Sequence, residues 1–285
     1  MTTHYAPGSP TLPEALARAG RAPRGLWVRG ALPTGRSVAM VGTRRASPSG
    51  LEWATRAAAA LAERGVAVWS GGAIGVDQAA HRGALDAGGV TVVCAPGGTE
   101  RPYPGGTDEL WREVERRGAI VSLVPPRDPP PRSGFFARNA VLAAMTEATV
   151  LVECPLVSGA RNTTTHARRL RKPVLVLAQG FGAPHAATVR EEARLGARIV
   201  HDLGHLLSAL SLDDRGRAEA PDRAEPPALS PPGAKLLAAL TSTPTHPDSL
   251  CARANLSAIE VAVATLELVV AGIAVDEPGR GLRIS

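Results

Sequence analysis

The chain of 285 residues has few aromatic side chains and almost no lysine. Aromatic residues make up 3% of the sequence, so a core built from its 44% hydrophobic residues must rest mainly on alanine, valine and leucine. Lysine occurs only at Lys172 and Lys235, which leaves arginine as 30 of the 32 basic residues. Arginine carries a planar, permanently charged group that matches phosphate oxygens. The net charge of +6 permits an anionic partner, although a GC-rich genome produces the same arginine bias.

Cysteine is too sparse for a disulfide framework or a cysteine-based metal site. Cys94, Cys154 and Cys251 are far apart and form no CxxC pair. Cys94 and Cys154 lie inside apolar runs, and we interpret them as buried, reduced thiols. The sequence therefore predicts no metal site and no cofactor.

Long hydrophobic runs and a signal peptide are also missing. No apolar run approaches the ~18–20 residues that a membrane-spanning helix needs. No signal peptide precedes the first regular segment. We therefore expect a cytoplasmic protein that makes no contact with a membrane.

Short apolar segments alternate with helical segments from residue 36 to residue 212. Strands are expected at residues 37–41, 66–69, 91–95, 119–123, 149–153, 174–178 and 198–200. Helices are expected at residues 49–64, 76–87, 107–117, 138–145, 163–170, 187–195 and 205–210. Apolar strands that alternate with helices are typical of a parallel sheet covered on both faces. The expected fold class is α/β, with an extended Rossmann-like, doubly wound and mainly parallel sheet.

The segments on either side of this domain have different compositions. Residues 1–35 are rich in proline and are expected to form an N-terminal arm with one short helix at 11–21. Residues 213–231 are polar and proline-rich, which indicates a linker. Residues 232–285 fit three helices, at 232–240, 247–254 and 257–271, and a hairpin at 273–276 and 281–284. This order predicts a small C-terminal winged-helix-like domain.

The third helix of this C-terminal domain carries no basic residue. Ser257 is expected to cap it, with Glu260 three residues further on. A recognition helix presents donors and positive charge to the DNA groove. We therefore expect this helix to contact protein rather than duplex DNA.

The loops that follow the strands are rich in glycine, serine and arginine. Ligands of doubly wound sheets bind at the carboxyl ends of the strands, where these loops lie. The first loop contains Gly42, Thr43, Arg44 and Arg45, and it leads into a helix whose free amide groups attract anions. Solvated arginines in an ordinary loop are the alternative. A phosphate-bearing ligand fits this loop better.

The second loop, Ser70-Gly71-Gly72-Ala73-Ile74-Gly75, does not match the GxGxxG dinucleotide fingerprint. Its glycines still permit a phosphate to approach the backbone. Asp77 and His81 follow at a spacing of four residues, which favours a hydrogen bond between them along one helix face over a metal or acid–base pair.

Two further loops complete the set. Phe135 and Phe136 are adjacent and precede Arg138, so one ring is expected in the core and the other as a platform for a base. The segment from Ser158 to Thr165 has small polar residues at a helix start and forms another anion-binding nest. Loops after several strands exceed the needs of one small phosphate and suit a nucleic-acid strand or an extended nucleotide.

Five short segments of the sequence, in the same order, together resemble the DNA-processing protein A (DprA/Smf) family. They are VGTRRASPSG at 41–50, SGGAIGVDQAAH at 70–81, YP at 103–104, FFARN at 135–139 and VECPLVSGARNTTTHA at 152–167. The resemblance covers residues 36–210 and extends to the C-terminal domain. Members of the family usually have a second basic residue where this chain has Ala140.

The resemblance implies a single-stranded DNA-binding recombination mediator without enzymatic activity or catalytic residues. Such a protein would protect incoming DNA, assist loading of the RecA recombinase in natural transformation, and form a homodimer through its Rossmann domain. Arg44, Arg138 and Asn139 would contact phosphates. The residues expected at the DNA are Gly42, Thr43, Arg44, Arg45, Ser70, Gly71, Gly72, Phe136, Arg138, Asn139, Ser158, Gly159, Asn162 and Thr163.

Two other classes of protein share features with this sequence. Lonely-Guy-type nucleoside-monophosphate phosphoribohydrolases use a PGGxGTxxE loop, and residues 96–100 read PGGTE without the second Gly-Thr pair or the correctly spaced Glu. A nucleotide-sensing Rossmann protein would bind one nucleotide in the same loops. Release of a free base from AMP would identify the enzyme, and binding of oligo-dT would identify the DNA-binding protein.

Overall fold

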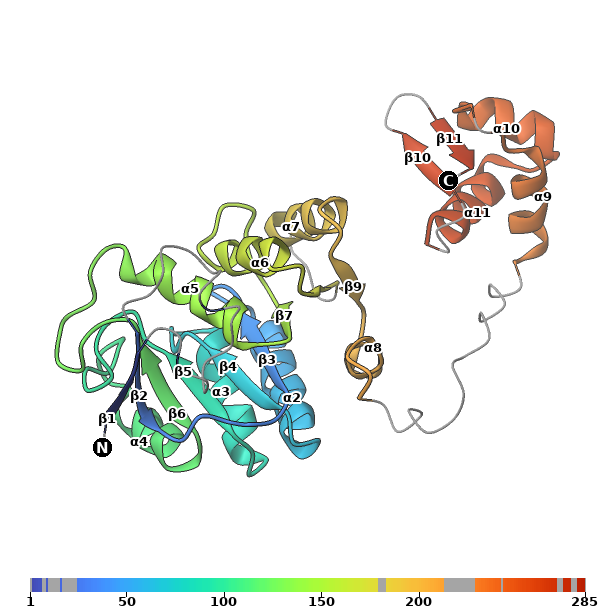
Figure 1. Ribbon diagram of the computed structural model, residues 1–285. Helices are drawn as coiled ribbons and strands as arrows, with labels where there is room; N and C mark the ends of the chain where they lie inside the picture. The colour runs from blue at the N-terminus through green and yellow to red at the C-terminus, as the bar shows by residue number, and fades with distance from the viewer. Residues whose placement is uncertain are drawn as a thin grey trace. The chain divides into compact units, whose positions relative to one another are not determined.

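A computed structural model describes residues 2–6, 9, 16, 25–178, 183–212, 229–241, 243–270, 274–277 and 281–284 of the chain (Figure 1). The chain divides into two compact units, Met1–Gly216 and Arg217–Ser285. Each unit has its own hydrophobic core.

Nine strands form one sheet in the first unit, in the order β1-β2-β6-β5-β4-β3-β7-β8-β9. Seven of them, from β6 to β9 in this order, are mutually parallel. The fold is therefore the predicted doubly wound, mainly parallel α/β class. The strands are β1 Thr2–Tyr5, β2 Leu26–Gly30, β3 Ser37–Val41, β4 Ala67–Ser70, β5 Thr91–Cys94, β6 Ala119–Ser122, β7 Ala148–Leu151, β8 Val174–Leu177 and β9 Arg198–Val200.

Helices cover both faces of the sheet (Figure 1). Val38, Met40 and Val68 point to the face on which α2, α3 and α8 pack. Ala39, Val41 and their neighbours point to the other face, which α5, α6 and α7 cover. The helices are α2 Pro48–Glu63, α3 Val76–Asp86, α4 Asp108–Arg117, α5 Gly134–Met145, α6 Ala160–Arg169, α7 Ala183–Arg194 and α8 Leu203–Ala209.

The chain winds outward from β3 in two directions. It first builds β4, β5 and β6 on one side of β3, and then it crosses back to build β7, β8 and β9 on the other side. A doubly wound sheet binds its ligand where the strand order reverses, beyond the carboxyl ends of the strands. The switch point between β3 and β7 is therefore the expected position of a site.

The segment expected to form a separate N-terminal arm contributes two strands instead. β2 pairs antiparallel with β6, and β1 pairs antiparallel with β2. Alternate residues of β2, Leu26 and Val28, are almost fully buried in the core. Residues 2–5 and 26–30 therefore belong to the sheet. The helix expected at 11–21 lies outside the described residues except for Leu16, which is buried.

The second unit contains the expected helices and hairpin, α9 Pro231–Ala239, α10 Pro247–Ala254, α11 Ala258–Val270, β10 Ala274–Glu277 and β11 Gly281–Ile284. The predicted cap of the third helix is confirmed, since the Ser257 hydroxyl donates to Glu260 at 2.7 Å and accepts from its amide at 3.3 Å. Asn255 takes the left-handed conformation that ends α10. Residues 213–228 of the expected linker lie outside the described part of the chain.

Two other expectations concern single features of the chain. Cys94 and Cys154 are free and buried, as predicted. None of the described helices is by itself long and apolar enough to cross a bilayer.

Candidate functional site

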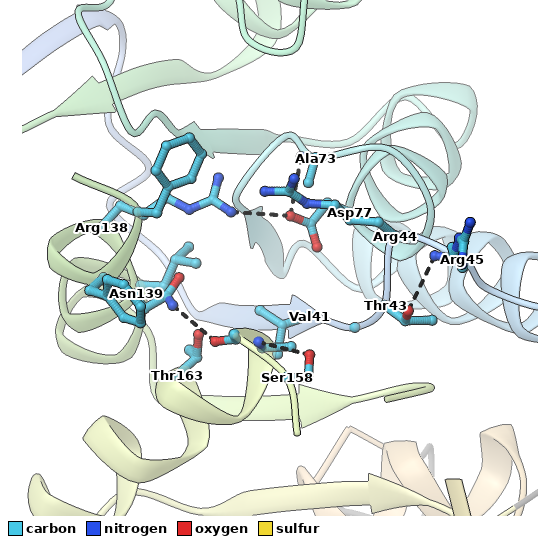
Figure 2. A pocket seen from close by; sticks show the side chains of 16 residues that line it. Val41, Thr43, Arg44, Arg45, Ala73, Asp77, Arg138, Asn139, Ser158 and Thr163 are labelled. Carbon is cyan, nitrogen blue, oxygen red and sulfur yellow. Dashed lines mark hydrogen bonds and ion pairs between the residues drawn. The ribbon is translucent and has the colours of Figure 1, made fainter. Parts of the chain in front are cut away.

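A cavity of about 340 Å³ opens at the switch point between β3 and β7 (Figure 2). The loops after β3, β4 and β7 and the first turns of α5 and α6 line it. Most of the residues expected at the ligand are part of this lining, namely Gly42, Thr43, Arg44, Arg45, Phe136, Arg138, Asn139, Ser158, Gly159 and Thr163.

The first loop is held tightly against its neighbours. The amide of Thr43 donates to the carbonyl of Glu153 at 2.6 Å, and the amide of Arg45 donates to the Thr43 hydroxyl at 3.2 Å. A Cβ atom at Gly42 would lie 2.5 Å from the Val76 side chain, so only glycine fits there. The side chains of Arg44 and Arg45 remain exposed, and no carboxylate in the described part of the chain pairs with either.

The helix that follows this loop does not offer open anion-binding donors, which corrects the prediction for α2. The Glu153 carboxylate accepts from both the amide and the hydroxyl of Ser47, each at 2.8 Å. The Ser47 hydroxyl oxygen in turn accepts from the amide of Gly50 at 3.1 Å. A carboxylate of the protein therefore already occupies the position that an anionic ligand would take at this helix.

Arg138 extends into the protein and not into solvent (Figure 2). Its guanidinium donates to the carbonyls of Gly71 and Cys94 and lies 3.9 Å from the Asp77 carboxylate. Only 11% of the side chain is exposed, and both hydrogen bonds come from Nη1. Its buried Nε has no partner within the described residues.

The second loop contributes different residues from those expected. Ser70 is fully buried, and its hydroxyl donates to the Met40 carbonyl at 2.6 Å. Gly71 lies against the Arg138 guanidinium, since a Cβ atom there would be 2.3 Å from its central carbon. Ser70, Gly71 and Gly72 are not part of the cavity lining, and Ala73 and Asp77 line it instead.

Asp77 and His81 form no hydrogen bond with each other, so that prediction is wrong. Asp77 accepts from the amide of Ala73 at 3.2 Å, and burial raises its pKa although Arg138 acts in the opposite direction. His81 Nδ1 lies 2.7 Å from the Thr91 hydroxyl, which itself donates to the Val68 carbonyl. His81 is therefore the neutral tautomer with its proton on Nδ1. Burial, and the nearby charge of Arg138, lower its pKa to about 3.

The two phenylalanines have separate positions. α5 begins at Gly134, so Phe135 and Phe136 lie on its first turn and not in the preceding loop. Phe136 is 60% exposed at the edge of the cavity. The guanidinium carbons of Arg44 and Arg138 each lie 5.9 Å from the centroid of the Phe135 ring. Phe135 thus orients two cations by cation–π contact, a role that the sequence did not predict.

The start of α6 faces the cavity and is weakly capped. The first residue of α6 is Ala160, whose amide donates to the Ser158 hydroxyl at 3.3 Å. No other side chain of the described residues caps this helix end. The fully buried hydroxyl of Thr163 lines the cavity and has no hydrogen-bond partner within the described residues. A helix N-terminus with a free hydroxyl is suited to bind an anion.

Asn139 joins α5 to the start of α6. Its side-chain amide donates to the Gly159 carbonyl at 3.1 Å (Figure 2). It also donates to the Asn162 side chain at 3.4 Å. Asn162 therefore lies behind the lining and supports it. Ala140, the position without the second basic residue, is buried and is not part of the lining.

The cavity combines free arginines, an open helix end and an unpaired buried hydroxyl. This combination suits a ligand that carries phosphate. No cluster of His, Cys, Asp and Glu among the described residues is able to hold a metal ion.

Comparisons with known proteins agree with the motifs. The model of the family described as DNA recombination-mediator protein A matches residues 3–211, and the model of the DprA winged helix domain matches residues 219–280. A putative DNA processing protein DprA from Mycobacterium tuberculosis is 40% identical over 185 residues, which cover 64% of this chain and 48% of the relative. Protein Smf from Escherichia coli is 29% identical over 269 residues, which cover 92% of this chain and 72% of the relative. The chain spans about half the length of its Mycobacterium tuberculosis relative.

Solved structures share the fold. DNA processing protein A from Streptococcus pneumoniae superposes with a TM-score of 0.67 at 24% identity, over 72% of this chain and 73% of that structure. The Helicobacter pylori protein, whose structure addresses its single-stranded DNA binding mode, gives a TM-score of 0.65 at 24% identity, over 74% of this chain and 96% of that structure. With the family model matched over both sides of the switch point, the chain belongs to the DNA recombination-mediator protein A family.

Proposed function

We propose that this protein binds single-stranded DNA without strong sequence preference through the switch-point cavity and acts as a recombination mediator. The observation that carries the proposal is the pairing of unneutralised Arg44 and Arg45 with the open start of α6. Both features attract phosphate, and they lie in loops from opposite sides of the switch point. The Helicobacter pylori relative, which is described as binding single-stranded DNA, supports the same ligand.

The phosphate contact is assigned to Arg44 and Arg45 rather than to Arg138. Nη1 of Arg138 donates to Gly71 and Cys94, and Nη2 faces Asp77. Within the described residues the Arg44 guanidinium has no hydrogen bond or ion pair, and it lies over the ring of Phe135. Gly42, Thr43, Ser158, Gly159 and Thr163 would then surround a phosphate, and Phe136 would face a base. Ser70, Gly71, Gly72 and Asn162 would act behind this surface, and Asn139, which lines the cavity, would hold the start of α6 in place.

The proposed role in the cell is to protect incoming DNA and to assist RecA loading in DNA uptake. A homodimer formed through the Rossmann domain and an intracellular location belong to the same proposal. The protein would have no catalytic activity of its own.

A phosphoribohydrolase would need an open glycine loop at residues 96–100, and this loop is closed. Gly97 and Gly98 are buried, and Cβ atoms there would lie 2.8 Å and 2.2 Å from backbone atoms of Pro130 and Pro126. The carboxylate of Glu100 pairs with Arg127 at 3.1 Å. These glycines approach a proline-rich segment of the protein and leave no space for a phosphate.

Binding of a fluorescent dT oligomer at two salt concentrations, beside AMP, tests the proposal. Each phosphate contact that is lost lowers the salt dependence of the affinity, by about 0.7 in the logarithmic slope for a single strand. We expect Arg44→Ala to weaken binding and to lower this slope, with Arg56→Ala, an exposed arginine on α2, as the control. An unchanged slope in Arg44→Ala would show that the cavity is not the DNA site. Conversion of AMP to a free base would identify the enzyme instead.

A further inference from the structure

Two buried polar side chains lie on α7, although none of the described side chains of this helix lines the cavity. Glu192 is fully buried, and His185 is also buried. They are about two helical turns apart, so they lie on the same face of α7. Both reach the segment around the start of α6, where the loop that follows β7 ends in the lining residues Ser158 and Gly159.

The Glu192 carboxylate holds two arginines of α6. Its Oε1 accepts from Arg161 Nε at 2.7 Å, and its Oε2 accepts from Arg168 Nη2. The Thr164 hydroxyl also lies 3.4 Å from Oε1. The side chains of Arg161 and Arg168 are only 21% and 22% exposed, so all three charged groups are largely removed from water.

Helix packing alone does not require this ion network. The desolvation of buried charges offsets most of what their attraction contributes, and apolar side chains of similar volume often stabilise a protein as much or more. Apolar residues at the same positions would therefore hold α7 on α6 equally well. A second contact of Arg161 gives the network a role beyond stability.

Arg161 connects Glu192 to the loop after β7. Its Nη1 donates to the Leu156 carbonyl at 2.8 Å while its Nε donates to Glu192. Because the guanidinium is planar and rigid, the carboxylate that binds one edge sets the direction of the other donors. At the start of the same loop, His185 Nδ1 accepts from the Cys154 amide at 2.6 Å. α7 thus holds this loop at two points, directly through His185 and indirectly through Arg161.

We propose that Glu192 is a positioning residue for the phosphate site. It orients Arg161, and Arg161 fixes the loop that presents Ser158 and Gly159 to the ligand. The inference rests on the proposed function and extends its site to α7. The network then serves the shape of the cavity wall, whereas its contribution to stability is replaceable.

Two variants of the full chain separate position from stability. Arg161→Lys keeps the charge beside Glu192 but replaces the rigid fork with a point charge on a flexible stem, which no longer fixes the Leu156 carbonyl. The triple variant Arg161→Leu, Arg168→Leu, Glu192→Leu replaces the whole network with apolar side chains. It removes two positive charges and one negative charge, so Arg190→Leu, at an exposed position of α7, is the control for net charge.

We expect the triple variant to keep or exceed the melting temperature of the wild type, because apolar packing replaces buried charges. Its affinity for the dT oligomer should nevertheless be about five-fold lower than that of Arg190→Leu, the effect of losing about one hydrogen bond to a phosphate. Arg161→Lys should weaken binding by a similar factor relative to the wild type. Hydrogen exchange at the amides of residues 156–159 should be faster in both loop variants and unchanged in Arg190→Leu.

Equal affinities of the triple variant and Arg190→Leu would overturn the inference, since the network would then serve stability alone. Wild-type affinity and wild-type loop exchange in Arg161→Lys would also overturn it, and this result decides the question if the triple variant does not fold. Failure of the wild type to bind dT would overturn the proposed function. In that case the exchange rates would still show whether Arg161 fixes the loop.

Discussion

Arginines of the same cavity have opposite roles, and burial decides between them. Arg44 and Arg45 are exposed and unpaired, which leaves their charge for a ligand. Arg138 is 11% exposed and faces a buried carboxylate and two carbonyls. A buried ion pair is costly to break because the remaining partner stays in a poorly solvated position. Arg138 therefore stabilises the wall of the cavity that it helps to line.

The Arg138–Asp77 pair predicts a strongly non-additive effect on stability. Arg138→Met should lower the free energy of unfolding by about 3–5 kcal/mol, because it leaves Asp77 buried and unpaired. Adding Asp77→Asn should recover part of this loss, since the amide oxygen still accepts from Ala73 and carries no charge. Urea denaturation of the two single variants and the double variant measures the coupling. Purely additive losses would show that the two groups do not interact.

His81 predicts an acid sensitivity of the first unit. Its pKa is lowered to about 3 in the fold, whereas an unfolded histidine has its usual value of 6.5. Between these values the unfolded chain takes up a proton and the folded chain does not. His81 therefore makes stability fall as the pH falls from about 6.5 to about 3, by at most about 1.4 kcal/mol per pH unit. Asp77, with a raised pKa, acts in the opposite direction.

The contribution of His81 is isolated by comparison with His81→Leu. The difference in unfolding free energy between wild type and variant should shrink as the pH is lowered from 7 to 4. Thr91 keeps its bond to Val68 in the variant, so no new unpaired donor is created. A pH-independent difference would mean that His81 titrates normally in the folded protein.

Helix ends determine where the site lies at the scale of the elements. α2 starts at a carboxylate of the protein, whereas the first turn of α6 carries the Thr163 hydroxyl, which has no hydrogen-bond partner within the described residues. α11 is a further element with an unusual surface, because Ile259 and Val263 are 78% and 61% exposed one turn apart. The expectation that this helix contacts protein stays a prediction.

Removal of the negative charge at the start of α2 should change stability and binding in opposite directions. Glu153→Gln leaves the Ser47 cap in place but loses a carboxylate at the helix N-terminus, where a negative charge contributes about 0.3–1 kcal/mol. The same substitution removes a negative charge beside the loop of Arg44. We therefore expect a lower melting temperature and tighter binding of the dT oligomer. Glu52→Gln, an exposed carboxylate on the same helix, serves as the control. Weaker binding would indicate that Glu153 itself orients the loop.

At the scale of the whole molecule, the two units have separate cores. Every residue that lines the cavity belongs to the unit Met1–Gly216, and Leu236, Leu250 and Leu268 form the core of the other. We expect limited proteolysis within the proline-rich residues 213–228 to leave a fragment of the first unit that binds dT with the affinity of the full chain. A large loss of affinity in that fragment would show that the second unit contributes to the DNA site.

Sequence patterns were sufficient for the sheet because apolar runs are a local property. The seven parallel strands begin and end within two residues of their expected positions, and the motif at 41–50 led directly to the arginine loop. β1 and β2 were missed, since β2 gains its bonds from β6, a strand distant in the sequence, and the edge strand β1 pairs only with β2 among the described strands. The start of α5 at Gly134 was also missed, because a proline-rich segment obscures the helix signal.

Local sequence thus determined the fold class, the positions of the parallel strands along the chain and most of the loops around the cavity. Only the tertiary structure decided which side chains in those loops are free. Arg44 and Arg138 look alike in the sequence, yet one is exposed and the other is held by Asp77, a residue 61 positions away. Charge availability depends on burial and on partners brought together by folding, and neither is encoded by the motif alone.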